Sequence, residues 1–118
     1  MKLRTPESIY ANPCDDDYEG MAHICCTGEN GYWFSLSRHI GDNSVEVMVL
    51  DQINHKMSDI QVTLSETCLI VDVGNDGARH LDGNSNYQIA FTASPEELNL
   101  IDQTLKVLLN GTGTYSKL

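Results

Sequence analysis

The stretch GENGYWFSLSRHI, residues 28–40, determines the expected fold. Its Asn30-Gly31 pair favours a tight hairpin turn with a positive φ angle. The residues after the turn then alternate as in a half-buried strand, with Tyr32, Phe34 and Leu36 on one face and Trp33, Ser35 and Ser37 on the other. Residues 22–27 supply a plausible partner strand before the turn, so this part of the chain predicts a β-hairpin.

Four further segments have the composition or alternation of strands, at residues 45–49, 60–65, 68–73 and 87–93. Residues 68–73 are nearly all apolar, which is typical of a central strand. Between the last two strands, residues 74–86 form a polar, glycine-containing stretch that we interpret as a loop or loose hairpin. Residues 1–20 contain two prolines and three consecutive aspartates, so we expect an irregular acidic segment there.

The last element is a helix, expected over residues 94–110. Ser94 and Glu97 form a Ser-x-x-Glu capping box around Pro95, which suits the first helical position. The apolar residues that follow have helical spacing and define one stripe: Leu98, Ile101, Leu105 and Leu108. The sequence therefore predicts a single α+β domain over residues 1–118, a β-rich antiparallel meander of about six strands with one C-terminal amphipathic helix packed on the sheet.

Composition narrows the classes of function. The chain has 118 residues, of which 41% are hydrophobic, enough for a core without disulfides or metals. No apolar run approaches the ~20 residues that cross a bilayer. The N-terminus has no signal-peptide pattern, so we expect a cytoplasmic protein with free thiols at Cys14, Cys25, Cys26 and Cys68.

The charge is strongly acidic, with 17 Asp and Glu against 7 Lys and Arg and a formal net charge of −10. Four of the basic residues lie near the ends, so residues 5–105 hold only three basic side chains against all 17 acids. Such a surface repels phosphates, which argues against direct binding to nucleic acid or to an anionic membrane. A basic protein is the partner that this charge favours, although acidity also simply promotes solubility.

Searches for catalytic or metal chemistry give weak signals. Residues 15–20 resemble the start of a calcium loop, but Cys26 occupies the position of the chelating glutamate. His23 and Cys25 share a strand face, yet no second pair completes a zinc site. His39, His55 and His80 fall in separate segments and are interpreted as unrelated. We therefore assign no catalytic residue, metal or cofactor.

Two features keep other functions open. Asp76, His80 and Asp82 share one segment and could meet a cation or polar ligand. Trp33 points away from Phe34, and we favour packing under the helix over the alternative of an exposed interface anchor.

The order of these elements resembles the immunity protein 10 family over roughly residues 33–109. The matching segments are YWFSLSR (32–38), VEVMVLDQ (45–52), IQVTLS (60–65), CLIVDV (68–73), YQIAF (87–91) and the PEEL helix start (95–98). The Asp51-Gln52 pair after the valine-rich strand is the most distinctive match. The resemblance implies a small bacterial cytoplasmic protein, without catalytic residues, that neutralises the toxin of a polymorphic toxin or contact-dependent growth inhibition system.

We accordingly expect an immunity protein that binds a cognate toxin domain, with a cationic nuclease as one candidate, and occludes its active or substrate-binding site. Its expected contacts are exposed acids: Asp15, Asp16, Asp17, Glu19, Asp42, Glu46, Asp76 and Asp82. The alternative is a small-ligand-binding protein or small enzyme with a cavity between sheet and helix, with His23, Cys25 or the segment from Asp76 to Asn86 at its mouth. The oligomeric state stays open.

Overall fold

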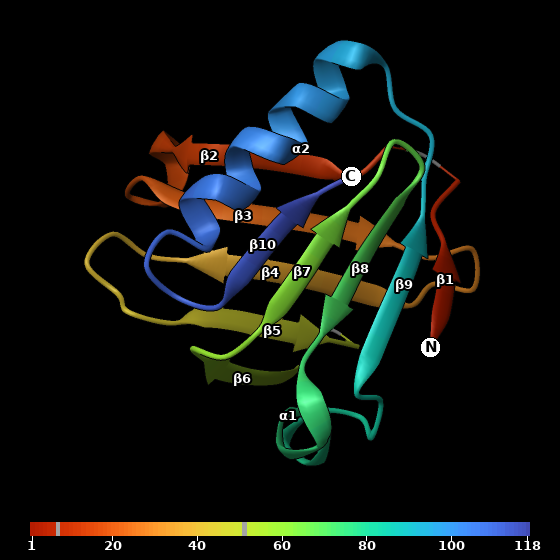
Figure 1. The fold of residues 1–118 in the computed structure, drawn as a ribbon, viewed down its shortest axis with the longest axis vertical. Coiled ribbons are helices and arrows are strands. Elements are labelled where there is room, and N and C mark those ends of the chain that lie inside the picture. Colours follow the sequence, from red (N-terminus) through yellow and green to blue (C-terminus); the bar gives the residue numbers. More distant parts are fainter. Residues whose placement is uncertain (7, 51) are drawn as a thin grey trace.

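The computed structural model describes residues 1–6, 8–50 and 52–118, and within them the chain forms ten strands in two five-stranded sheets, with two α-helices (Figure 1). Sheet I has the order β1 (Lys2–Arg4), β9 (Asn86–Ala90), β8 (Cys68–Asp72), β7 (Gln61–Leu64) and β10 (Thr114–Lys117). Sheet II has the order β2 (Tyr10–Asp15), β3 (Met21–Thr27), β4 (Trp33–Arg38), β5 (Val45–Val49) and β6 (Ile53–Met57). No helix in these described ranges is long and apolar enough to cross a membrane.

The two sheets pack face to face around one core, and the helix α2 (Pro95–Leu108) lies beside β10 and across β2 and β3 (Figure 1). Phe34 of β4 and Tyr87 of β9 meet between the layers, with ring centroids 5.0 Å apart. On the helix, Ile101, Leu105 and Leu108 are fully buried. The apolar stripe that the sequence predicts therefore faces the core.

Both ends of α2 are fixed by the contacts that its sequence and neighbours supply. At the start, the backbone N–H of Glu97 donates to Ser94 Oγ at 3.2 Å and the Ser94 N–H donates to the Glu97 carboxylate at 2.9 Å, which confirms the capping box. At the end, the Arg38 guanidinium from β4 donates to the carbonyls of residues 107, 108 and 110 at 3.3, 3.2 and 2.7 Å. Arg38 thus supplies partners for carbonyls that a helix leaves free.

A buried carboxylate joins α2 to β10. Asp102 is only 4% exposed, and its carboxylate accepts the Tyr115 hydroxyl at 2.6 Å. The ammonium groups of Lys106 and Lys117 lie 3.2 and 3.6 Å from the same carboxylate. Burial raises the pKa of Asp102, but the Tyr115 hydrogen bond and the two lysines lower this pKa by a larger amount. The net shift is therefore downward.

The β-rich α+β class and the C-terminal helix are confirmed, but the single six-strand antiparallel meander is wrong. Residues 1–20 are not irregular throughout: β1 pairs in parallel with β9, and β2 pairs with β3 around a bulge that accommodates Pro13. The segment expected as a loop contains a short helix, α1 (Gly74–His80). After α2, the chain returns as β10 and pairs in parallel with β7. Strand β6, with its polar, exposed positions, also went unpredicted.

Candidate functional site

The outer face of sheet II, turned away from sheet I, carries the chemistry that the core does not use. Residues paired across antiparallel strands project to the same face of a sheet. The observed register therefore aligns two rows across this face. The first row contains Tyr10, Cys25, Ser35, Met48 and Asn54, and the second contains Asn12, His23, Ser37, Glu46 and Lys56.

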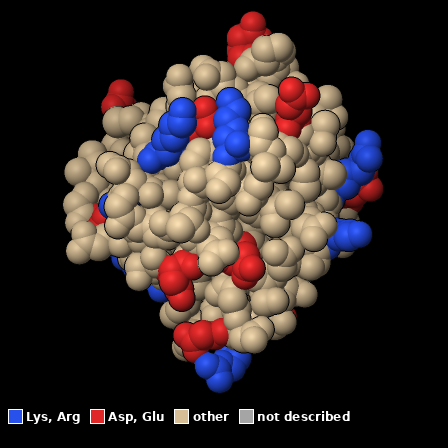
Figure 2. Space-filling view, viewed as in Figure 1, with Lys and Arg blue, Asp and Glu red and all other residues tan. Residues whose placement is uncertain are grey.

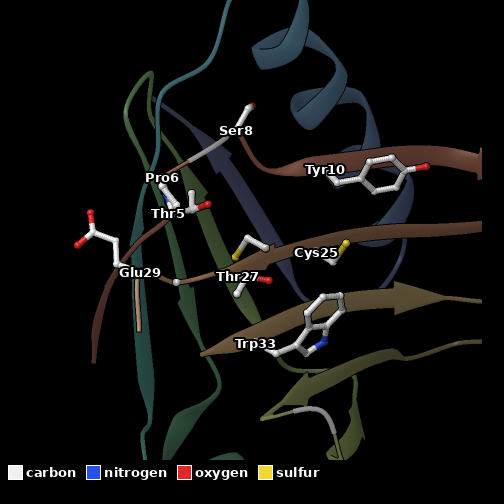
Figure 3. Close-up of a pocket in the computed structure, with 10 residues that line it drawn as sticks. Thr5, Pro6, Ser8, Tyr10, Cys25, Thr27, Glu29 and Trp33 are labelled. Carbon is white, nitrogen blue, oxygen red and sulfur yellow. The ribbon is translucent and has the colours of Figure 1, made fainter. Parts of the chain in front are cut away.

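This face is hollowed by two adjoining depressions, which we call together the outer groove. One encloses about 370 Å³ beside the β3–β4 turn, and Figure 3 shows Tyr10, Cys25 and Trp33 projecting into it from three neighbouring strands, with Thr5, Pro6 and Ser8 along one side. The other encloses about 340 Å³ and reaches Tyr18, Met21, His39, Glu46 and Met48. Cys25 and Trp33 line both depressions, so the groove runs along the strands.

Trp33 lies in this groove and not beneath α2, so the interpretation that we favoured from the sequence is wrong. The reason is its register: Trp33 pairs with Thr27 of β3 and shares the face of Ser35 and Ser37, whereas Phe34 and Leu36 point into the core. Its side chain is partly covered. The indole nitrogen is buried and has no hydrogen-bond acceptor among the residues that the structure describes.

One end of the groove is built on a largely buried pair between His23 and Asp15. His23 Nε2 lies 2.7 Å from Asp15 Oδ2, and the Asp17 N–H donates to Asp15 Oδ1 at 3.0 Å. The His23 hydrogen bond lowers the pKa of the Asp15 carboxyl. The His23 ring is also flanked by Tyr10 and Tyr18, at centroid distances of 5.3 and 5.8 Å. Asp15 is therefore an internal acceptor that orders the following turn, and we no longer propose it as a contact.

The other predicted acids of this region face solvent around that same end. Asp16, Asp17 and Glu19 are exposed on and beside the short 3-10 helix Asp16–Tyr18. Glu46 lines the groove itself. Asp42 lies in the turn before β5, where its carboxylate is 3.4 Å from the Lys56 ammonium. We call Asp16, Asp17, Glu19 and Glu46 the acidic end of the groove.

Asp76 and Asp82 lie elsewhere and do not form a ligand cluster with His80. Asp76 pairs with Arg79 at 2.5 Å on the exposed surface of α1. The Asp82 carboxylate accepts hydrogen bonds from the hydroxyls of Tyr32 and Tyr87, two buried side chains, so Asp82 has a structural role. His80 stacks on His55 with centroids 4.1 Å apart, which corrects the interpretation of these histidines as unrelated.

The two adjacent cysteines, Cys25 and Cys26, both have raised pKa values. Burial raises the pKa of Cys25, and burial together with Cys25 raises that of Cys26 to about 12. No hydrogen bond joins Cys25 Sγ to His23 within the described residues. The same ranges contain no group of three or more His, Cys, Asp or Glu side chains placed to hold a metal ion. Cys25 is thus a partly buried thiol in the floor of an open groove.

The side of the molecule formed by sheet I and α2 has no continuous acidic or basic patch in view among the described residues (Figure 2). Figure 2 shows this side of the molecule, where acidic and basic side chains are scattered with wide uncharged areas between them. The outer positions of β7 and β8 are occupied by Thr63, Ile70 and Asp72, among others. On the other side of the molecule, Tyr10, Tyr18 and Trp33 and the acids Asp16, Asp17, Glu19 and Glu46 lie in or beside the outer groove.

No protein-family model matches the chain, and no curated protein or solved structure shows significant similarity to it. The resemblance to the immunity protein 10 family accordingly stays a prediction. Its most distinctive pair includes Asp51, which lies outside the described residues. The chemistry of the outer groove is therefore the basis for a functional proposal.

Proposed function

We propose that this chain is an immunity protein that binds a cognate toxin domain through the outer groove and blocks the toxin's active or substrate-binding site. The observation that carries the proposal is the combination of large apolar side chains on one sheet face with solvent-facing acids on and beside that face. Tyr10 and Tyr18 are 51% and 58% exposed, and Trp33 of β4 and Met48 of β5 also line the groove. Tryptophan, tyrosine and methionine are enriched in protein interfaces, where Trp and Tyr often provide most of the binding energy.

The charge supports a basic partner. A protein with a net charge of −10 attracts a cationic domain over several ångströms and accelerates its encounter. A nuclease toxin holds phosphate groups with lysine and arginine, so an acidic surface can occupy the same positions and exclude the substrate. The on-rate is then expected to fall as salt shortens the Debye length from about 10 Å towards 3 Å.

A growth-rescue assay tests this function. The genomic neighbourhood of the chain is searched for a toxin domain, which is then expressed from an inducible promoter with and without the chain. We expect the wild-type chain to restore growth and to copurify with the toxin in a defined ratio. Continued toxicity in the presence of soluble, folded chain would contradict the proposal.

Charge reversals locate the interface in the same assay. The triple variant Asp16→Lys, Asp17→Lys and Glu19→Lys is expected to abolish rescue, because it places repulsive charges beside the groove. The matched control reverses Glu66, Asp76 and Glu96, which are exposed elsewhere and change the net charge equally. We expect the control to rescue growth. Loss of rescue in both triples would indicate that total charge, and not the groove, governs binding.

A further inference from the structure

The two ends of the outer groove, which follow one another along β4, differ in chemistry. Near Trp33 its lining includes Tyr10, Cys25 and Pro6, while near Ser37 it includes Glu46. Ser37 is paired with Glu46 across β4 and β5. Four residues of an extended strand separate Trp33 from Ser37, a distance of about 13 Å at ~3.3 Å per residue. The groove therefore offers an apolar site and an acidic site at a fixed separation.

The Glu46 carboxylate is available for a partner. Its cross-strand neighbour is Lys56, but the Lys56 ammonium pairs with Asp42 at 3.4 Å. Among the described residues, Glu46 has neither a hydrogen bond nor an ion pair. A carboxylate that lies half-buried in a groove without a partner gains more from an incoming cation than a fully hydrated surface acid does.

An aromatic ring lies at the same end. Tyr18 lines the depression that contains Glu46 and is 58% exposed, and its ring is held edge-on to His23 at a centroid distance of 5.8 Å. The face of an exposed tyrosine ring attracts lysine and arginine side chains. The stems of those side chains can in turn cover Met21 and Met48, which line the same depression.

We propose that the outer groove recognises a segment of a basic protein that presents an apolar side chain to Trp33 and, about 13 Å away, a lysine or arginine to Glu46 and Tyr18. The proposal rests on the proposed function and specifies the chemistry of the toxin segment. A spacing of about 13 Å corresponds to four residues of an extended segment or about nine of a helix. A second copy of this chain is a poor occupant, because it would place Asp16, Asp17 and Glu19 against a groove of the same charge.

The single tryptophan of the chain makes the groove directly observable. The ¹⁵N-labelled chain is titrated with the unlabelled toxin domain of the rescue assay, and the indole N–H resonance of Trp33 is followed. We expect this resonance to shift on binding. Trp33→Ala is expected to weaken binding at least about 30-fold, as for a central interface anchor.

The salt dependence of binding distinguishes the contribution of the acidic site from that of the apolar site. Glu46→Gln is expected to weaken binding about fivefold near 50 mM salt and much less near 500 mM, where screening already suppresses the attraction. Glu66→Gln, on the β7–β8 turn, is the matched control and is expected to bind as the wild type does. Toxin neutralisation with an unmoved Trp33 resonance and wild-type affinity of Glu46→Gln would overturn this inference and the groove as the binding face, but it would leave intact the proposal that the chain neutralises a toxin.

Two synthetic peptides test the groove independently of the toxin. Both carry one leucine, and four residues further on one has arginine where the other has glutamate. We expect the arginine peptide at millimolar concentration to shift the Trp33 resonance, and the glutamate peptide to leave it unchanged. Equal responses to both peptides would overturn the inference even if the toxin does not bind. A Trp33 shift on concentrating the chain alone would identify a second copy as the occupant and also overturn it.

Discussion

Replacing Asp82 tests whether its carboxylate stabilises the fold, as its hydrogen bonds indicate, and does not serve as a contact to a partner. The Asp82 carboxylate accepts the hydroxyls of Tyr32 and Tyr87, and these two side chains are 7% and 0% exposed. In Asp82→Ala both hydroxyls lose their acceptor. A hydrogen bond to a charged group contributes about 1.5–3 kcal/mol, and half-burial of Asp82 places each bond at the low end, so the free energy of unfolding should fall by about 3 kcal/mol.

Urea denaturation followed by tyrosine and tryptophan fluorescence measures this loss. With a slope of about 2 kcal/mol/M, the midpoint should fall by roughly 1.5 M. Asp82→Asn retains one acceptor oxygen and should lose about half as much, which keeps the prediction testable if the alanine variant does not fold. Asp76→Ala, which removes an exposed carboxylate paired with Arg79, is the control and should leave the midpoint unchanged.

The pH dependence provides an independent check. Burial raises the pKa of Asp82, but the hydrogen bonds from Tyr32, Tyr87 and Asn84 outweigh it, so the pKa is lowered in the folded state. A lowered pKa stabilises the fold above the ordinary aspartate value near 4, and this contribution is lost as the pH falls through the lowered value. The difference between wild type and Asp82→Asn should therefore shrink in acid. An equal difference at pH 7 and pH 2, or a midpoint unchanged by Asp82→Ala, would refute this reasoning.

Three further changes test other parts of the fold. Arg38→Met removes the guanidinium that caps α2 and should lower the free energy of unfolding by about 1–2 kcal/mol in urea titrations; an unchanged midpoint would show that water replaces it fully. In Asp102→Asn, the free energy of unfolding should fall less steeply as the pH drops below about 4, because the pKa of Asp102 is also lowered in the folded chain. The same acid dependence in this variant as in the wild type would contradict that lowered pKa. Iodoacetamide should modify the exposed Cys14 well before Cys26, whose pKa is raised to about 12, as read by peptide mass spectrometry.

The sequence correctly predicted the elements that are determined by short local motifs. The Asn30-Gly31 turn is present with Gly31 at φ 81°, and it joins β3 to β4 as expected. The capping box at Ser94 starts α2 at Pro95. These features depend on contacts within a few residues, so a single sequence contains the information that sets them.

Elements that depend on distant partners were missed. Strand β10 has only four residues and is mostly exposed, and it exists because it pairs with β7 more than fifty residues earlier. Strand β2 contains Pro13, which normally argues against a strand but is accepted at this bulged sheet edge. Helix α1 contains Gly74 and Gly77, whose low helix propensity favoured a loop.

The candidate site was predicted in part for the same reason. Alternation along residues 33–37 correctly placed Trp33 opposite Phe34, but it does not reveal which face a second sheet covers. The acidic residues were visible in the sequence, whereas the burial of Asp15 against His23 depends on the pairing of β2 with β3. Knowledge of that pairing would also have grouped Tyr10 and Tyr18 with His23.

Hydroxyl-radical footprinting of the chain with and without the toxin domain tests the central claim most directly, because it measures the solvent accessibility of individual side chains. The account predicts that Tyr10, Tyr18 and Met48 become protected in the complex, while Met1 and Tyr115, which lie outside the outer groove, keep their reactivity. Protection of Met1 and Tyr115 with unchanged reactivity in the groove would contradict the assignment of sheet II as the binding face.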